Sequence, residues 1–466
     1  MHLASLERHP FATLVFGINR VIRGSWLVSC ILPCMADLHT PLPQSKAPTP
    51  RRSVKDNGSR QGGSNLLAPI LGGAGVVLLI AVLFAVILPM AQSTGSGAEG
   101  GSSSSAARPT TGWVSFVAVG DNLPDEYIGY YADKLAGKAD DGKYDYAPIF
   151  APIAPYIQAA DLAYIDQETH VGGYDLGVNG YPAFNTTDEM ADAVVDAGFD
   201  LVASATNHSY DWGYYGALDH SLSVWEKKPV AFTGTAVTQE QYERIPLVER
   251  NGITFALLNY TYGVNGYTQS ELPPYAVNFI DENRIRTDVA RAREEGADVV
   301  LAAMHWGTEN MTEADEDQQR WAQLLADLDV DVVLGSHPHV IGPLKWLSNS
   351  NGSGHKTLVA YSLGNFLADH ESPNAINALE GMLSCDFVRD ANSSEVHVEN
   401  VKWTPVICQS NADRSEFAVY AMDDYTEELA KKNRVFTETK KPLDWIWEKT
   451  KSIVGNEWFE QAQTTA

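Results

Sequence analysis

The sequence predicts a layered α/β protein, because apolar runs of strand length that end in a polar residue alternate with stretches of helical character. The runs are VSFVAVGD, DLAYIDQE, FDLVASATNH, ADVVLAAMHWG and VDVVLGSHPH. Between them lie helix-like stretches such as TTDEMADAVVDAG, ENRIRTDVARAREEG and DEDQQRWAQLLADL, the first of which begins at Thr and Asp and stops at Gly. This repeated unit is typical of α/β folds, which gather their functional groups at the carboxyl ends of the strands.

Other stretches of the chain predict further strands and one last helix. RIPLVERNGITFALLNYTYG predicts two strands joined by a hairpin at Asn251 and Gly252, because Asn-Gly is a strong two-residue hairpin signal. From about Thr357 to Pro405 the periodicity is again that of strands. DWIWEKTKSIV, near the end, predicts a terminal helix.

The charge of the chain is strongly acidic and unevenly distributed. The 466 residues carry 33 Lys and Arg against 59 Asp and Glu, a net charge of −26. Residues 1–92 are basic, so residues 93–466 alone carry a net charge of −31. Such a surface repels polyanions within roughly 8 Å at physiological salt. We therefore expect no nucleic-acid partner.

One segment is apolar enough to span a membrane. PILGGAGVVLLIAVLFAVILP, from Pro69 to Pro89, has 19 uncharged residues between its prolines, and a span needs about 20. Basic residues precede it and a Gly- and Ser-rich stretch follows it, which places the N-terminus in the cytoplasm and the later chain outside the cell membrane. We expect a cytoplasmic tail (1–65), an uncleaved signal anchor (66–90) and a flexible stalk (91–112); a cleaved signal peptide is the alternative.

The first 34 residues do not form a convincing second span, because Arg20 and Arg23 interrupt their apolar residues. They can form an amphipathic surface segment. The preferred interpretation is that translation starts at Met35, which would leave 1–34 untranslated.

Two of the four cysteines, Cys385 and Cys408, fall in successive strand-like runs of the predicted exported part. An exported pair can form a disulfide. Two buried free thiols are the equal alternative, because the sequence does not show whether their Cβ atoms approach within about 4 Å.

Polar residues of the metal-ligand type follow five of the predicted strands. They are Asp121, Glu168, Asn207 with His208, His305, and His337 with His339. Strand ends in a layered fold share one edge, so these side chains can converge there. Carboxylate, amide oxygen and imidazole are ligands for borderline divalent metals such as Mn, Fe, Zn or Co. A single His after a strand is more often structural, but five coincidences favour a metal site.

The stretch VLGSHPHVIGP places His337 and His339 on either side of Pro338. Proline fixes its own φ near −65° and favours an extended conformation for the residue before it. We expect the two imidazoles to diverge and to serve two metal positions about 3.5 to 4 Å apart.

Six motifs of this sequence, taken together, resemble those of a known family. VGDNLPDEYI, DLAYIDQET, ATNHSYDWG, MHWGTE, GSHPHVIGP and YSLGNFLAD, in this order, resemble the CapA capsule-synthesis (poly-γ-glutamate biosynthesis) family, which is similar to calcineurin-like metallophosphoesterases. The resemblance covers about residues 113–410 and leaves 411–466 as a C-terminal extension. It implies a four-layer αββα sandwich of the metallophosphoesterase type, here preceded by one transmembrane helix, with a metal site between the inner sheets.

The resemblance also implies a role for each candidate residue. Asp121 and His339 would serve one metal, and Glu168 would bridge to the second. The second metal would be held by Asn207, His305 and His337. His208 matches the position of the phosphoesterase proton donor, and Asp211 can orient it.

This sequence departs from the phosphoesterase pattern at two places. A His usually lies two residues after the first Asp, where this chain has Leu123, so one metal loses a ligand. The usual Asn-Leu-Glu is here Asp166-Gln167-Glu168, which adds negative charge. Three aromatic residues of the HWG and HSYDWG motifs adjoin the candidate ligands: Trp306, Tyr210 and Trp212. They can form a platform for a sugar or peptide chain, or simply pack behind the site.

Two classes of function follow. The first is a membrane-anchored, metal-dependent hydrolase or transferase that acts on an envelope polymer or a phosphoester. The second is a non-catalytic component of a capsule-polymer synthesis or export complex, which would work with other capsule-synthesis membrane proteins. The acidic exported part weighs against an extended groove for a polyanion, but not against a short pocket that recognises a chain end.

Overall fold

The computed structural model describes residues 112–459 except 140, 370–373 and 391–393. The predicted tail and anchor, and all but the last residue of the stalk, lie outside the described residues. Within the described part, no helix is both long and apolar enough to cross a membrane.

The first sheet has eight strands in the order β14-β13-β12-β1-β2-β3-β4, with β11 pairing with the end of β1. Its strands are β1 (Trp113–Leu123), β2 (Leu162–Gln167), β3 (Leu201–Ala203), β4 (Ala231–Thr233), β11 (Asn365–Ala368), β12 (Glu380–Arg389), β13 (Val396–Ser410) and β14 (Phe417–Ala421). The four strands β1 to β4 are parallel, and β12 to β14 continue the sheet antiparallel. The carboxyl ends of β1, β2 and β3 therefore lie along one edge.

The second sheet has six strands in the order β5-β6-β7-β8-β10-β9. They are β5 (Leu247–Arg250), β6 (Ile253–Thr261), β7 (Val299–His305), β8 (Val332–Ser336), β9 (Leu344–Ser348) and β10 (Lys356–Ala360). The predicted hairpin between β5 and β6 is confirmed: Asn251 and Gly252 have φ of 49° and 81°, as a two-residue turn with two left-handed positions requires.

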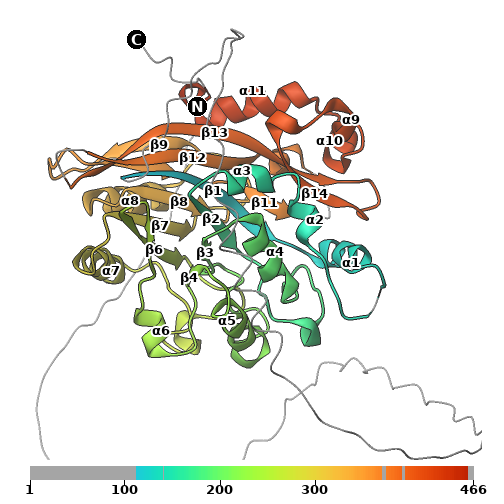
Figure 1. The fold of residues 1–466 in the computed structure, drawn as a ribbon, viewed down its shortest axis with the longest axis horizontal. Coiled ribbons are helices and arrows are strands. Elements are labelled where there is room, and N and C mark those ends of the chain that lie inside the picture. Colours follow the sequence, from blue (N-terminus) through green and yellow to red (C-terminus); the bar gives the residue numbers. More distant parts are fainter. Residues whose placement is uncertain (1–111, 140, 370–373, 391–393, 460–466) are drawn as a thin grey trace, which may run out of the picture. The chain divides into compact units, whose positions relative to one another are not determined.

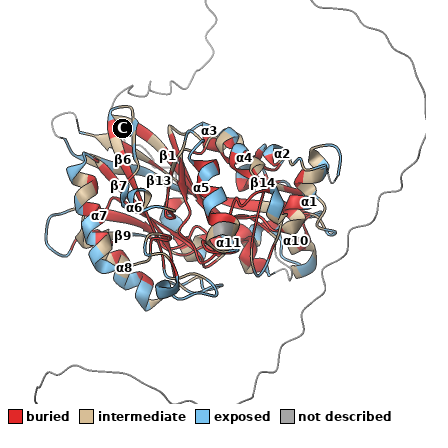
Figure 2. Cartoon of the chain, turned by 90° about the horizontal axis from the view of Figure 1, so that it is seen from below, coloured by how far each residue is buried: buried red, intermediate tan, exposed pale blue. Residues whose placement is uncertain are grey.

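Helices cover the outer face of each sheet (Figure 1). The helices beside the first sheet are α1 (Glu126–Leu135), α2 (Ala147–Phe150), α3 (Ala154–Gln158), α4 (Glu189–Ala197) and α5 (Asp219–Trp225), and those beside the second are α7 (Glu282–Glu294) and α8 (Glu316–Asp327); the short α6 (Gln239–Glu243) precedes β5. The predicted glycine stop of α4 is confirmed, because Gly198 takes the left-handed φ of 104° that favours glycine. Figure 2 shows exposed residues on helices such as α8 and mainly buried residues in the strands.

The alternation of β1 explains the layers. Phe116 and Ala118 point into the core between the two sheets, whereas Val117 and Val119 point into the core beneath the helices. Between the sheets, the Phe387 ring contacts Phe116 at 5.6 Å and Phe255 at 5.0 Å. The order helix, sheet, sheet, helix agrees with the predicted αββα sandwich.

The C-terminal residues complete the sandwich. β14 pairs with β13, and the helices α9 (Glu427–Ala430), α10 (Arg434–Thr439) and α11 (Leu443–Val454) lie beside β13 (Figure 1). Ile446 and Trp458 join the core between the sheets, and the Trp458 indole donates to the Leu344 carbonyl at 3.1 Å. DWIWEKTKSIV is helical as predicted, and residues after 410 pack into the same core as the strands before them.

Cys385 and Cys408 are free thiols. They lie on the neighbouring strands β12 and β13, but Cys385 points into the core between the sheets and Cys408 packs against the core beneath the helices. Opposite faces of one sheet keep the two sulfur atoms apart, so the disulfide alternative does not apply to this structure.

Candidate metal centre

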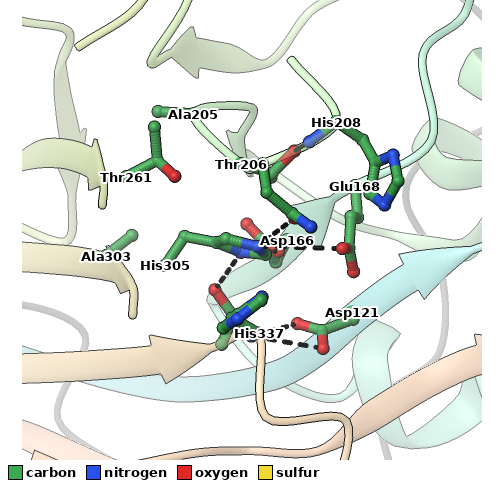
Figure 3. A network of polar contacts seen from close by, with 12 residues as sticks. Asp121, Asp166, Glu168, Ala205, Thr206, His208, Thr261, Ala303, His305 and His337 are labelled. Atoms are coloured by element: carbon green, nitrogen blue, oxygen red, sulfur yellow. Dashed lines mark hydrogen bonds and ion pairs between the residues drawn. The ribbon is translucent and has the colours of Figure 1, made fainter. Parts of the chain in front are cut away.

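The candidate ligands meet where strands of both sheets end (Figure 3). Asp121 lies near the end of β1, Glu168 directly follows β2, and His305 is the last residue of β7. Asn207 and His208 follow β3, and His337 and His339 follow β8. All except the half-buried His339 are buried. The convergence of these predicted residues on one edge agrees with the strand-end argument.

The loop that carries the two histidines differs from the expected extended conformation. His337 and His339 have φ of 93° and 56°, both left-handed. Such a conformation costs about 1–3 kcal/mol per residue and persists only where surrounding contacts hold it. Here the His337 N–H faces both carboxylate oxygens of Asp121, at 3.3 and 3.4 Å. The extended conformation expected of His337 before Pro338 was therefore wrong, because this backbone contact overrides the local preference.

A first group joins Asp121, Glu168 and His339. The His339 Nδ1 lies 3.0 Å from Asp121 Oδ2 and 3.8 Å from Glu168 Oε2. Its other close partner is the side-chain oxygen of Asn365, at 3.0 Å. The structure thus places together the three residues that the resemblance assigned to one metal.

A second group forms around His305. Its Nε2 lies 2.8 Å from the Asn207 side-chain oxygen and 3.7 Å from Glu168 Oε1, and its ring centroid lies 4.9 Å from that of His337. Glu168 therefore reaches one group with each of its two oxygens. That is the position expected of a bridging ligand.

Several buried polar atoms of these groups have no hydrogen-bond partner among the described residues. They include both carboxylate oxygens of Glu168 and Nδ1 of His337. A buried polar group left without a partner costs about 1–3 kcal/mol, and more when it is charged. Carboxylate and imidazole atoms in this state are suited to bind divalent cations, so the residues present fit the metal that the motifs imply.

Burial also sets the protonation of the site. It lowers the pKa of His305 to about 3 and that of His337 to about 2, so both imidazoles are neutral and keep a lone pair for a ligand bond. Burial raises the pKa of Glu168 well above its usual value and that of Asp166 to about 7. For His339 burial alone would lower the pKa, but the carboxylates of Glu168 and Asp121 raise it to about 10. A divalent cation would relieve the crowding of these carboxylates.

Two carboxylates at the site were not identified as ligands from the sequence. Asp166 Oδ2 lies 3.4 Å from His305 Nδ1, and Asp166 forms a possible metal-binding group with Asp121 and His305. The exposed Glu309 forms another with His337 and His339, whose ligand atoms all lie within 4.8 Å of one another. Asp166 lies two residues before Glu168, and Glu309 lies four residues after His305. An acid near a candidate ligand was therefore the available signal.

Leu123 occupies the position where a phosphoesterase would have a His. Its side chain packs with Phe184 and Ala368 in a small apolar cluster. An alkyl side chain in such a cluster offers no ligand atom. Leu123 therefore supplies no ligand atom at this position, and the number of metal ligands stays a prediction.

His208 lies beside the two groups with a fixed ring. Its Nδ1 is 2.7 Å from Asp211 Oδ2, and its ring meets that of Phe184 edge to face at 4.7 Å. The second nitrogen, Nε2, lies 3.4 Å from the amide nitrogen of Asn265. Asp211 thus holds His208 as predicted and leaves Nε2 at the opposite side of the ring.

The three aromatic residues considered as a platform have different environments. Trp306 is 1% exposed and its indole donates to the Tyr361 carbonyl at 3.0 Å, and Tyr210 is also buried. These two residues therefore pack behind the site. Trp212 is 44% exposed and is the member of the three that can contact a ligand.

Comparison with known proteins gives one family match. The family model described as Bacterial capsule synthesis protein PGA_cap matches residues 115–370, more than half of the chain. The matched range begins within β1 and ends just after β11. It includes every residue of the two groups described above.

Two curated relatives resemble part of this chain. The PGA biosynthesis protein CapA of Bacillus subtilis (strain 168) is 29% identical over 191 residues, which is 40% of this chain and 46% of that protein. The capsule biosynthesis protein CapA of Bacillus anthracis is 23% identical over 233 residues, which is 47% of this chain and 54% of that protein. The chain spans about half the length of the curated relatives it matches.

Among solved structures, the calcineurin-like phosphoesterase YfkN from Bacillus subtilis is similar with a TM-score of 0.37 and 12% identity, covering 72% of this chain and 99% of that one. A TM-score of this size carries no argument about fold or activity. The fold described above stands on its own strand pairing and packing.

Proposed function

Because this chain belongs to the bacterial capsule synthesis protein PGA_cap family, we propose that it is a metal-dependent hydrolase or transferase that acts on a phosphoester or envelope polymer during capsule synthesis or export. The observation that carries the proposal is the position of Glu168. Its two buried oxygens, which have no hydrogen-bond partner among the described residues, face His305 on one side and His339 on the other. A structural carboxylate would be expected to have partners.

The metal-binding residues divide into two sets. Asn207, His305 and His337 would hold one divalent ion, and Asp121 and His339 would hold another, with Glu168 shared. Bound divalent ions supply Lewis-acid polarisation of the substrate and lower the pKa of water. Proton transfer would be carried out by side chains of the protein.

His208 is the residue suited to move a proton. The Asp211 carboxylate lies at Nδ1 and favours the tautomer with its proton on that nitrogen. Nε2, which lies 3.4 Å from the Asn265 amide nitrogen, can exchange a proton with a leaving or attacking oxygen that replaces this contact. Asp211 is itself held, because its Oδ2 also accepts from the Phe184 N–H at 2.8 Å. Burial of both side chains keeps bulk water from competing for the proton.

The proposed location is the outer side of the cytoplasmic membrane, with the chain anchored by residues 66–90. The support is the uncharged segment and the basic residues on its N-terminal flank. In that position the catalytic part could reach envelope polymers and other membrane proteins of capsule synthesis.

The alternative function is a non-catalytic component of a capsule-polymer export complex, and Leu123 is the observation that favours it. With an alkyl group in place of a ligand, one of the two metal positions is less complete. The two functions differ in turnover of a generic aryl phosphodiester by the purified full-length protein with Mn²⁺. Turnover supports the enzyme. No turnover with any divalent metal, together with measurable polymer binding, supports the export component.

A further inference from the structure

Three aromatic side chains are exposed beside the candidate metal centre. Tyr262 is 51% exposed, and Tyr267 and Trp212 are each 44% exposed. Single exposed apolar residues are common on protein surfaces, but a group of large aromatic residues at one site indicates a binding surface. All three come from loops that follow strands ending at the metal centre, Trp212 after β3 and the two tyrosines after β6.

Contacts connect the two tyrosines to the centre. The Tyr262 ring centroid lies 4.7 Å from that of His337, and the Tyr262 N–H donates to the His305 carbonyl at 3.0 Å. The Tyr267 ring meets the buried Tyr210 ring edge to face at 5.1 Å. Both exposed rings therefore adjoin residues of the centre or of the His208 loop.

The segments that carry these rings are held in place. Between the tyrosines, the Asn265 N–H donates to the Asn207 carbonyl at 2.8 Å. The Trp212 indole donates to the Ala183 carbonyl at 3.2 Å. Aromatic side chains that are already held lose little conformational entropy when a ligand stacks on them.

The loops around the centre contain no Lys or Arg. The loop ranges are 168–188, 204–218, 262–281, 306–315 and 337–343, and they contain acidic residues such as Glu309. Two arginines approach the same edge from the C-terminal segment. Both are paired there: Arg414 contacts Asp125 at 3.0 Å, and Arg434 contacts Asp369 at 3.5 Å. His339, in the last of these loops, is itself paired with Asp121 and Glu168. A ligand segment that carries repeated negative charges would therefore meet no unpaired Lys, Arg or His cation in these loops.

We propose that Tyr262, Tyr267 and Trp212 bind uncharged pyranose residues next to the reacting group, so that the substrate is a neutral glycan bearing the group that reacts at the metal centre. A pyranose ring presents an apolar face of C–H groups that stacks on an aromatic ring, and its hydroxyl groups need no cation. This inference rests on the proposed function and specifies its substrate class. We expect that a polyanionic chain such as poly-γ-glutamate does not bind along these three rings.

The test is a binding measurement on the full-length protein. The probes are neutral oligosaccharides of glucose, galactose, mannose and N-acetylglucosamine, with poly-γ-glutamate as the charged comparison, titrated by calorimetry in low and high salt. We expect at least one neutral oligosaccharide to bind with an affinity that salt does not change. Replacement of Tyr262, Tyr267 or Trp212 by Ala should weaken this binding by about two- to tenfold, the scale of one aromatic contact.

Two further variants make the result specific. Tyr262→Phe retains the ring and should keep most of the affinity. Trp346→Ala removes an exposed aromatic residue far from the metal centre and should have no effect on sugar binding. Trp346 lines a cavity with Arg293 and Asp298. These two residues precede β7, so they lie at the opposite end of the sheet from His305. Metal content, measured on every variant, shows whether the loss of the Tyr262 ring disturbs His337.

The inference is overturned if no neutral oligosaccharide binds, or if binding is unchanged in all three Ala variants with normal metal content. Salt-sensitive binding of poly-γ-glutamate that depends on the same three rings would also overturn it. Turnover of the aryl phosphodiester, which contains no sugar, tests the proposed function separately. Sugar binding without turnover would support the three rings as a glycan-binding site and exclude the proposed enzymatic function.

Discussion

His208 and Asp211 form a buried pair in which the imidazole Nδ1 lies 2.7 Å from the carboxylate Oδ2. The pair lies three residues apart in one loop, so local chain geometry suffices to orient the ring. Because Asp211 occupies Nδ1, the nitrogen that remains for a substrate is Nε2. A metal-ligating histidine can have the same carboxylate partner, so the pair alone does not assign the role. What favours a proton donor is that His208 belongs to none of the candidate metal-binding groups among the described residues.

The first prediction follows from this pair. His208→Ala should leave the metal content of the protein unchanged and reduce turnover by about 10²-fold or more, the usual scale of general acid catalysis. Asp211→Asn should give a smaller loss, because the ring remains but its orientation and protonation are no longer fixed. Metal analysis and turnover are measured on the same preparations. A parallel loss of metal and activity in His208→Ala would identify this residue as a ligand.

The second prediction concerns unequal metal binding. An ion near His337 would have Asn207, His305 and Glu168 as further candidate ligands. An ion near His339 would have Asp121 and the shared Glu168, because Leu123 offers no ligand. Purified protein should therefore hold close to one ion per chain and approach two only with added metal.

Two substitutions separate these ions. His337→Ala should abolish the tightly bound ion, and His339→Ala should mainly lose the weakly bound one. His355→Ala is the matched control, since His355 is a half-buried histidine whose Nε2 faces the Val330 carbonyl at 3.1 Å, outside both groups. If both site variants retain tight metal binding, the histidines are structural.

The third prediction concerns Glu309, the exposed acid near His337 and His339. If its carboxylate completes the shell of the weakly held ion, Glu309→Gln should lower the affinity for the second ion by about tenfold while the first remains. Glu313→Gln changes an exposed acid of the same loop that belongs to none of the candidate groups among the described residues, and should have no effect. An equal loss of affinity for the second ion in the two variants would mean that only the general negative charge of the loop matters. No loss in Glu309→Gln would exclude Glu309 as a ligand.

Strand-end residues were predictable from the sequence, because the α/β pattern places Asp121, Glu168 and His305 on one edge whatever the details of packing. The position of Glu309 beside His337 and His339 was not predictable in this way, since it lies on a loop whose path is set by tertiary contacts. The left-handed φ of His337 was missed for the same reason: its N–H faces the Asp121 carboxylate, which comes from a strand 216 residues earlier.

The aromatic residues illustrate the same limit. Trp306 and Tyr210 are adjacent in sequence to candidate ligands, yet both are buried. Tyr262 and Tyr267 follow a strand with no predicted ligand, and they reach the site only because β6 pairs with β7. Sequence proximity to a ligand is thus a poor guide to which side chains are exposed at the site, whereas strand order in the sheet indicates which loops reach it.

The fourth prediction is topological. Residues from Thr94 to the end should lie outside the cytoplasmic membrane, because basic residues flank only the N-terminal side of the apolar segment. Protease added to intact, wall-stripped cells should remove this part, while a cytoplasmic marker protein stays intact. Full protection of the chain in cells, with digestion only after lysis, would reverse the orientation and remove the case for an envelope function.

The fifth prediction concerns Glu380, a buried carboxylate away from the metal centre. Burial raises its pKa well above the usual value, while the Cys408 N–H, which donates to it at 2.7 Å, opposes this only in part. The folded protein therefore binds the proton more strongly than the unfolded chain. The stability that this group contributes is complete below its unfolded pKa of about 4.3 and is lost as the pH rises through the folded pKa.

Glu380→Gln removes this titration while keeping an oxygen that can accept from the Cys408 N–H. The difference in unfolding free energy between variant and wild type should be near zero at about pH 4, and it should favour the variant increasingly as the pH rises to neutral and above. Thermal unfolding across this pH range measures the difference. Glu399→Gln, an exposed acid on β13, should show no such trend. A difference that does not change with pH, or that favours the wild type increasingly as the pH rises, would show that the pKa of Glu380 is not raised in the folded protein.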